Sequence, residues 1–240
     1  VVGNSNYGWF GAGRNFGTMY SNVDRIDFSN DSTTASPRGP LSLTRSGSSG
    51  ASGQAKGPSI RPAKTLGYGW FGGGSGPLAT VERIDFSNDS LTVSPRGPLS
   101  LGRERLAATG NSNYGWFGGG STGSAVATVD RIDFSNDSGT ASVRGPLFTG
   151  RRDLAATGNS NYGWFGGGFP GPVATVDRID FSNDSSTASV RGPLSLERLK
   201  LAATGNSNYG WFAGGDNVST VDRIDFSNDS ATASQRGPLN

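Results

Sequence analysis

The sequence contains no cysteine and no histidine, and only one methionine. Without cysteine there are no disulfides and no thiolate chemistry, and without histidine the chain lacks the commonest general base and metal ligand. No apolar run approaches the roughly 18 residues that a membrane-spanning helix needs, and no signal peptide is visible at Val1. We therefore expect a non-enzymatic protein that has no metal or other cofactor and does not insert into a membrane.

Apolar residues are also scarce. They make up 33% of the chain, and 39 of the 240 residues are glycine, a composition that would suggest disorder if it were not periodic. Twenty of the 24 Phe, Trp and Tyr residues, however, occupy the four repeat positions represented by Tyr114, Trp116, Phe117 and Phe134. Such spacing predicts a layered hydrophobic core.

Five copies of one motif fill the sequence. Each contains Tyr-Gly-Trp-Phe, a glycine-rich stretch, a variable loop, Arg-Ile-Asp-Phe-Ser-Asn-Asp-Ser and finally Arg-Gly-Pro-Leu. The aromatic tetrads begin at Tyr7, Tyr68, Tyr114, Tyr162 and Tyr209. A period near 47 residues indicates a single repeat-built domain over residues 1–240, because such units cannot bury their apolar faces alone.

Each repeat is predicted to form four short antiparallel strands. In the third copy these are residues 106–109, 114–117, 128–134 and 140–144, separated by Gly, Asn, Ser and Pro. No segment shows the spacing of an amphipathic helix. The second strand carries Tyr114 and Trp116 on one face and Phe117 on the other, so both faces of the sheet must be covered.

Four-stranded sheets stacked radially meet that requirement, and small residues such as Ala107 and Ala108 suit the narrow centre of a ring. We expect an all-β fold, a five-bladed β-propeller with four antiparallel strands per blade and a closed ring. The alternative is an open stack belonging to a longer array. The expected blades are residues 1–41, 64–101, 106–149, 154–196 and 201–240.

One junction is longer than the others. From Arg38 to Tyr68 there are 30 residues, against 18 at the other three junctions. The extra sequence is rich in Gly and Ser, which is typical of a linker. We therefore expect residues 42–63 to be an irregular insertion forming a mobile loop, and the first strand of that blade to be less regular.

The two faces of the ring are predicted to differ in charge. In a four-strand meander, the turns after strands one and three open on one face, and the connections after strands two and four open on the other. The motif holds fifteen acidic and ten basic residues, whereas the rest of the chain holds eleven basic and four acidic ones. We expect one neutral to acidic face and one basic face; the alternative is ordinary solubilising loop charge.

The loops that differ between copies lie on the expected basic face, which makes them candidates for binding. The alternative is that loop tips vary because nothing constrains them. The candidate ligand-binding residues are Arg14, Phe16, Tyr20, Phe169, Arg103, Arg105, Arg151, Arg152 and Arg198.

Other sites have weaker support. Gly118-Gly-Gly120 is followed by neither a helix nor a lysine, so it indicates a sharp strand exit and not a phosphate loop. Asp133 and Asp137 lack the alternating ligands of a calcium loop. We expect Asp133 to pair with Arg131 or Arg144 between blades and Asp137 to close the turn. The same turns contain glycosylation sequons, at Asn30, Asn88, Asn136, Asn183 and Asn228.

The order of motifs in each copy resembles kelch-repeat β-propellers. Phe117-Gly118-Gly119, Ile132-Asp133 and Arg144-Gly-Pro-Leu147 follow the kelch order of a Gly-Gly doublet, a strand ending in Asp and a polar strand leading to Arg. The resemblance covers nearly the whole chain, but the Tyr and Trp that usually follow the kelch doublet have no counterpart. Propeller oxidases of the galactose oxidase kind need His and Cys ligands that this chain lacks.

For function, we expect a structural or binding module displayed outside a cell or on a virion, because near-identical tandem blades also resemble repeat regions of phage tail proteins. Its partner would be a protein or a cell-surface glycan, and the chain would form a homo-oligomer or part of a larger assembly. One alternative is a lectin with up to five similar glycan sites; another is an intracellular kelch-type scaffold. No nucleic-acid partner is expected, because the aromatic residues are predicted to lie in the core.

Overall fold

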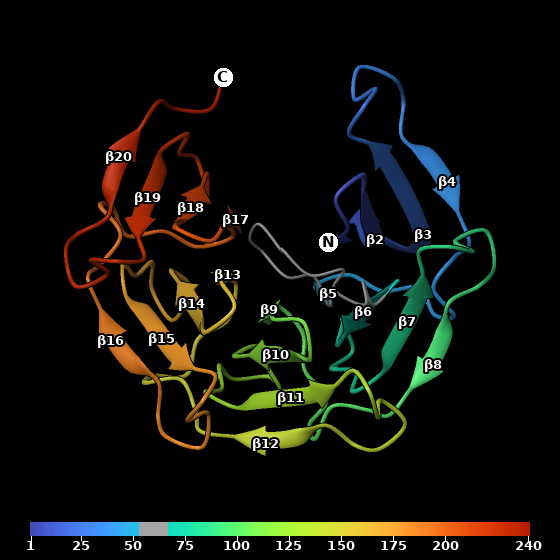
Figure 1. The fold of residues 1–240 in the computed structure, drawn as a ribbon, viewed down its shortest axis with the longest axis horizontal. Helices are drawn as coiled ribbons and strands as arrows, with labels where there is room; N and C mark the ends of the chain where they lie inside the picture. The colour runs from blue at the N-terminus through green and yellow to red at the C-terminus, as the bar shows by residue number, and fades with distance from the viewer. Residues whose placement is uncertain (53–66) are drawn as a thin grey trace.

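The chain is built from five four-stranded antiparallel sheets. A computed structural model describes residues 1–52 and 67–240, and within these ranges it contains twenty strands and no helix. The sheets follow one another around a common centre as the blades of a propeller (Figure 1). In each blade the strands pair in chain order, from the innermost to the outermost. The predicted fold class is confirmed.

The strand bounds repeat closely from blade to blade. Blade 1 contains β1 (Val2–Gly3), β2 (Tyr7–Asn15), β3 (Thr18–Asp27) and β4 (Ser36–Arg38). Blade 2 contains β5 (Ser49–Ser52), β6 (Tyr68–Gly72), β7 (Val81–Asp85) and β8 (Ser94–Arg96). Blade 3 contains β9 (Ala107–Gly110), β10 (Tyr114–Gly118), β11 (Val129–Asp133) and β12 (Ser142–Arg144). Blade 4 contains β13 (Ala155–Gly158), β14 (Tyr162–Gly166), β15 (Val176–Asp180) and β16 (Ser189–Arg191). Blade 5 contains β17 (Ala202–Gly205), β18 (Tyr209–Ala213), β19 (Val221–Asp225) and β20 (Ser234–Arg236).

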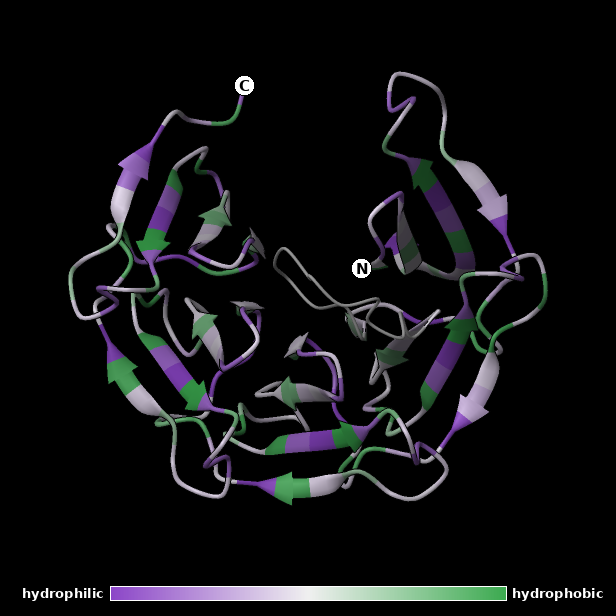
Figure 2. Ribbon diagram, viewed as in Figure 1, coloured by the Kyte–Doolittle hydropathy of each residue, from purple (hydrophilic) through white to green (hydrophobic). Residues whose placement is uncertain are grey.

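The hydrophobic core lies between neighbouring blades. One cluster joins Trp116 and Val129 of blade 3 to Phe165 and Ile179 of blade 4, and all four side chains are buried. Figure 2 shows hydrophobic positions on the third strand of each blade separated by hydrophilic ones; in β11 these are Val129 and Ile132, which are three residues apart and so lie on opposite faces of the strand. Both faces of each internal sheet are therefore packed against a neighbouring blade. The large side chains on both faces of the aromatic strand predict this arrangement.

The glycine that follows Tyr-Gly-Trp-Phe in blades 1 to 4 makes room for the next blade. A Cβ added to Gly118 would lie 2.7 Å from the Phe165 ring, and one added to Gly166 would lie 2.7 Å from the Phe212 ring. Blade 5 has Ala213 at the equivalent position, where no following blade packs against it in this structure. The glycine is thus required by packing between blades.

The expected insertion at residues 42–63 is partly wrong. Residues 49–52 form β5, the inner strand of blade 2, so this blade begins before residue 64; residues 53–63 lie outside the described residues. The Gly and Ser content has a packing reason. A Cβ at Gly50 would lie 2.8 Å from the carbonyl oxygen of Val1 in the neighbouring inner strand region. The inner strands near the crowded centre have room only for small residues, and the resulting composition is similar to that of a linker.

The ring has an open side between blade 5 and blade 1 (Figure 1). Inner strands β1, β5, β9, β13 and β17 lie against one another in series. Phe10 and Phe28 of blade 1, however, are 43% and 54% exposed, whereas the equivalent Phe117 and Phe134 of blade 3 are buried. The expected closure of the ring is therefore not observed.

We predict that Gly118→Ala destabilises the protein by about 1–3 kcal/mol, because the added methyl group overpacks the contact with Phe165. Gly139→Ala is the matched control, since a Cβ there meets no atom within 4 Å and blade 5 has Ala231 at this position. Urea unfolding followed by tryptophan fluorescence measures both. Equal stabilities of the two variants would contradict this role for Gly118.

Candidate functional site

A carboxylate lies at the centre of each internal blade interface. Between blades 3 and 4, Asp184 accepts a hydrogen bond of 2.9 Å from Trp116 Nε1 and one of 3.0 Å from Arg131. Arg144 Nε lies 3.6 Å from the same oxygen. Asp89, Asp137 and Asp229 receive the equivalent Trp and two Arg residues of the preceding blade at the other three interfaces. Each aspartate thus satisfies a buried indole and compensates two cations from another blade.

Aromatic stacking surrounds this contact. The Trp116 ring stacks on Phe181 of the next blade with 3.7 Å between centroids, and Tyr114 packs edge-on against Trp116. The Arg131 guanidinium lies 4.4 Å above the centre of the Tyr114 ring. The four regular aromatic positions of the motif therefore stabilise the contacts between blades.

The expected roles of the two aspartates are reversed. Asp133 does not form the interface pair; its Oδ1 accepts hydrogen bonds from the backbone and hydroxyl of Ser135, at 2.9 and 2.7 Å. The hydroxyl bond is the main reason that the pKa of Asp133 is lowered. Asp137 does not merely close the turn, because its Oδ2 binds Trp70 and Arg83 of blade 2. The turn is held by the first aspartate and the interface by the second.

A buried arginine holds the connection into each of blades 2 to 5. Arg151 lies between β12 and β13, where its Nη2 is 2.7 Å from Asp177 Oδ2 and its Nη1 donates to the carbonyls of Gly167 and Thr175. Burial raises the pKa of Asp177, and the Arg151 cation opposes that shift. Asp177 also accepts a hydrogen bond from the backbone of Phe148. The pair therefore ties the crossover between blades to the middle of blade 4.

The same arrangement removes three predicted ligand-binding residues from the surface. Arg103, Arg151 and Arg198 are buried, with carboxylate partners Asp130, Asp177 and Asp222 at 3.1, 2.7 and 2.6 Å. Arg45 pairs with Glu82 in blade 2, and burial lowers its pKa to about 10. The expectation that Arg103, Arg151 and Arg198 contribute to an exposed basic face is wrong, because they compensate carboxylates inside the blades.

The face formed by the β2–β3 type loops and the connections between blades, called here the loop face, has one backbone arrangement and unlike side chains. The residue after each buried arginine accepts a backbone hydrogen bond from the residue that directly follows the glycine run at the start of the loop. The donor and acceptor pairs are Ser75 to Ser46 (2.8 Å), Ser121 to Glu104 (2.8 Å), Phe169 to Arg152 (2.9 Å) and Asp216 to Leu199 (3.1 Å). Constant geometry with changing chemistry is typical of a recognition surface on a rigid scaffold.

Three charged residues beside these pairs adopt a left-handed backbone. Arg105, Asp153 and Lys200 have φ of 57°, 56° and 58°, and the equivalent residue of blade 2 is Gly47. A backbone ladder joins them, from Arg105 N to Gly47 O, from Asp153 N to Arg105 O and from Lys200 N to Asp153 O, at 2.7 to 2.9 Å. Non-glycine residues in this region cost free energy and are held there by the surrounding structure. The ladder fixes the loop face of neighbouring blades to one another.

The remaining predicted residues lie on the loop face. Arg14 and Phe16 are exposed at the tip of the long β2–β3 hairpin, and Tyr20 is 40% exposed on β3. The Arg152 guanidinium lies 4.4 Å above the Phe169 ring, and Arg105 is exposed.

Arg105 and Arg152 both lie near Asp153, at 3.6 and 3.5 Å. Lys200 pairs with Asp216 at 3.0 Å. Over the described residues, the loop face therefore carries mixed charge and is not the basic face that we expected.

The opposite face, formed by the turns after the first and third strands of each blade and called here the turn face, carries repeated crevices. One is lined by Asn111 of blade 3 and by Asn161, Tyr162, Asp180 and Phe181 of blade 4, with the serines beside them. The equivalent crevice of blade 1 is lined by Asn6, Tyr7, Asp27 and Phe28, again with neighbouring serines. Sequence reasoning did not single out these groups as a site, although the Asn-Ser-Asn-Tyr segment is visible in four of the five copies.

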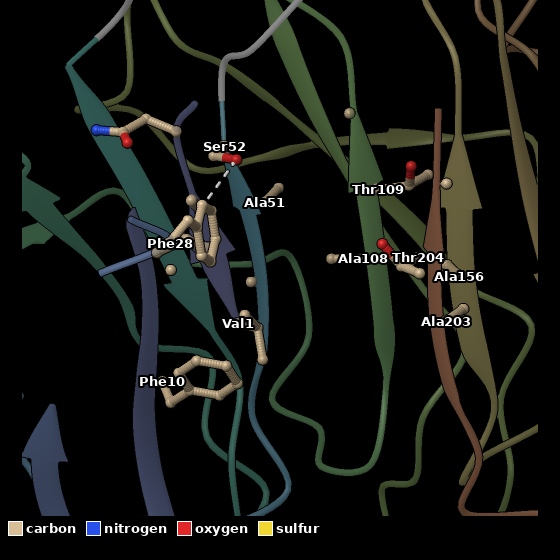
Figure 3. A pocket seen from close by; sticks show the side chains of 17 residues that line it. Val1, Phe10, Phe28, Ala51, Ser52, Ala108, Thr109, Ala156, Ala203 and Thr204 are labelled. Carbon is tan, nitrogen blue, oxygen red and sulfur yellow. Dashed lines mark hydrogen bonds between the residues drawn. The ribbon is translucent and has the colours of Figure 1, made fainter. Parts of the chain in front are cut away.

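The centre of the ring contains a cavity lined by small side chains. Figure 3 shows Ala108, Ala156 and Ala203 on one side of it and the exposed Phe10 and Phe28 on the other. Residues of all five inner strands line it. Among the described residues that line it, the polar side chains are those of serine, threonine and asparagine.

Residues 1–52 and 67–240 contain no cluster of three or more His, Cys, Asp or Glu side chains that would hold a metal ion, and no helix that is long and apolar enough to cross a membrane. No protein-family profile matches the sequence, and no curated protein matches it. The resemblance to kelch repeats and to phage tail proteins therefore stays an interpretation of the motifs.

We predict that Asp184→Asn destabilises the fold by about 3 kcal/mol, because Arg131 and Arg144 lose their compensating charge in a largely buried interface. The matched control is Asp31→Asn. Asp31 is the same residue of blade 1, but it is exposed, and the described part of the chain shows no partner for its side chain. Thermal unfolding in dilute solution compares them, and equal losses would refute the role of the interface carboxylate.

Proposed function

We propose that the chain is a non-enzymatic recognition module whose loop face binds a protein or a glycan on a cell surface. The observation that carries the proposal is the set of four loop-face pairs. Their backbone hydrogen bonds have nearly constant length, whereas the accessible side chains differ: Ser46 with Ser75, Glu104 beside the buried Ser121, Arg152 with Phe169, and Leu199 with Asp216. A scaffold that repeats while its displayed groups differ supports recognition, because each blade then contributes a different contact to one ligand.

The long hairpin of blade 1 supports the same proposal. Its tip exposes Phe16 completely, and Met19 and Tyr20 are 38% and 40% exposed nearby. Exposed aromatic side chains lower the solubility of a protein and often mark a binding surface. Aromatic and arginine side chains also provide most of the binding energy at protein interfaces. Together with the Arg152–Phe169 pair, they would form the anchors of the contact.

Display outside a cell or on a virus particle is the setting that we propose for this module. Near-identical tandem copies with neither Cys nor His resemble repeat regions of phage tail proteins. A loop face with several unlike anchors suits attachment to a surface.

The double variant Phe16→Ser, Tyr20→Ser and the single variant Phe169→Ser test the loop face. With fluorescently labelled protein on panels of bacterial and cultured eukaryotic cells, we expect wild-type protein to bind at least one cell type. Each variant is expected to bind it about 10-fold more weakly, because an aromatic anchor is lost. Periodate treatment of the cells should abolish glycan recognition, and mild proteolysis should abolish protein recognition.

The control is the double variant Leu91→Ser, Val143→Ser, which removes two exposed apolar side chains that lie away from the loop face. It should bind like wild type. If wild-type protein binds no cell in either panel, or if the control loses as much binding as the loop-face variants, the proposed recognition face is wrong.

A second candidate is a lectin, and the turn-face crevices favour it. They combine an aromatic ring with amide, carboxylate and hydroxyl groups, a set suited to sugar hydroxyls and the apolar face of a pyranose. Asn6, Asn113, Asn161 and Asn208 precede the tyrosine in four blades, whereas blade 2 has Gly67. Four complete sites would then act together through multivalency.

A glycan array tests this candidate. The fourfold variant with Asn6, Asn113, Asn161 and Asn208 changed to Ala should lose array binding, because the amides that we assign to sugar hydroxyls are removed. The loop-face variants should keep it. An array without hits for wild-type protein, or hits that survive the fourfold change, would remove the lectin hypothesis.

A further inference from the structure

The two blades at the open side of the ring carry unused halves of the blade interface. Blade 5 presents Trp211, Arg223 and Arg236, which are equivalent to Trp116, Arg131 and Arg144 of the interface between blades 3 and 4. We call this surface the donor end. Blade 1 presents Phe10, Phe28 and Asp31, which are equivalent to Phe165, Phe181 and Asp184. We call this surface the acceptor end.

Both ends are less covered than the internal interfaces. Trp211 is half-buried, while Trp9, Trp70, Trp116 and Trp164 are fully buried. Arg223 Nε is buried without a hydrogen-bond acceptor, and Asp31 and Arg236 are exposed. A Cβ added to Gly237 would meet no atom, whereas one added to the equivalent Gly97 would overlap the carbonyl of Gly139 on the next blade. An indole donor and two cations at one end and a carboxylate at the other are chemically complementary.

The internal interfaces keep the two ends of one chain apart. Each interface is fixed in its middle by the aspartate and at its outer edge by backbone bonds, such as those from Gly145 N to Asp184 O and from Ala188 N to Pro146 O, both 2.8 Å. The ladder through Arg105, Asp153 and Lys200 fixes the loop face as well. Closing the ring would require all four interfaces to rotate against these contacts, so the free ends remain available to another molecule.

We propose that the donor end of one chain docks on the acceptor end of a second copy, in a head-to-tail contact that continues the internal series of interfaces. In this contact Asp31 of the second copy receives Trp211, Arg223 and Arg236, and its Phe28 stacks on Trp211. Each chain has one end of each kind, so the contact is heterologous and its repetition builds chains of more than two copies.

Ala213 distinguishes this contact from the internal ones. It stands where Gly72, Gly118 and Gly166 receive the phenylalanine of the next blade, and a Cβ added to any of these glycines would lie 2.7 to 2.8 Å from that ring. The methyl group of Ala213 meets Phe10 of the second copy and loosens the seating. The association is therefore reversible, and Ala213→Gly tightens it.

Blocking one end at a time tests the proposal. Asp31→Arg places a cation against Arg223 and Arg236 and blocks the acceptor end. Gly237→Leu places a side chain where the internal interfaces have no room and blocks the donor end. Both positions are free in the single chain, so both variants fold. Gly139→Leu is the control, because blade 2 has Leu91 at that position.

Sedimentation velocity from about 1 to 100 µM, a range that reports weak to moderate association, should show wild type and Gly139→Leu forming oligomers that grow with concentration. Asp31→Arg and Gly237→Leu alone should stay monomeric, and their equimolar mixture should form dimers and nothing larger. Ala213→Gly should shift association to about 10-fold lower concentration. The proposal would be overturned if the mixture remained monomeric. It would also be overturned if wild type were monomeric and both blocked variants were less stable than wild type, because that result would mean that the two ends close on each other within one chain.

Discussion

The structure depends on an aspartate carboxylate that each repeat contributes to the preceding one. Each interface aspartate is presented by the turn after the third strand of one blade, and it satisfies an indole and two guanidinium groups of the blade before it. Neither the aspartate nor the arginines can be buried alone, because burying an ion without a partner of opposite charge costs far more free energy than leaving it in water. Folding of a repeat is thereby coupled to its neighbour, which explains how a chain with so few apolar residues forms a core.

The aromatic pattern was sufficient to predict most of the fold. Bulk on both faces of the Tyr114–Phe117 segment indicated sheets packed on both sides, and the strand bounds agree within about two residues, as expected for boundary assignments. The inner strand of blade 2 was missed because composition alone does not separate a linker from a crowded centre. Aligning the repeats residue by residue identifies the strand, because Arg45 and Gly47 of blade 2 then occupy the positions of Arg103 and Arg105 of blade 3.

The site was harder to predict, because a sequence shows which charges repeat but not which partner each one has. Arg103, Arg151 and Arg198 fall outside the motif and looked like loop cations, although their constant offset from the next inner strand was a sign of a structural role. The exchange of roles between Asp133 and Asp137 depends on the direction of the turn, which a residue pattern does not encode. Phe16, a candidate binding residue in a loop that differs between copies, is exposed because nothing in the repeat holds it.

The division of each interface into a donor half and an acceptor half also bears on how such a gene changes. Recombination between near-identical copies removes or adds whole periods, and the new junction still joins the Trp and Arg residues of one copy to the Asp of another. Every product has matched internal charges, whatever its number of copies. Blade number can therefore change between descendants while the pairing of each internal aspartate is inherited.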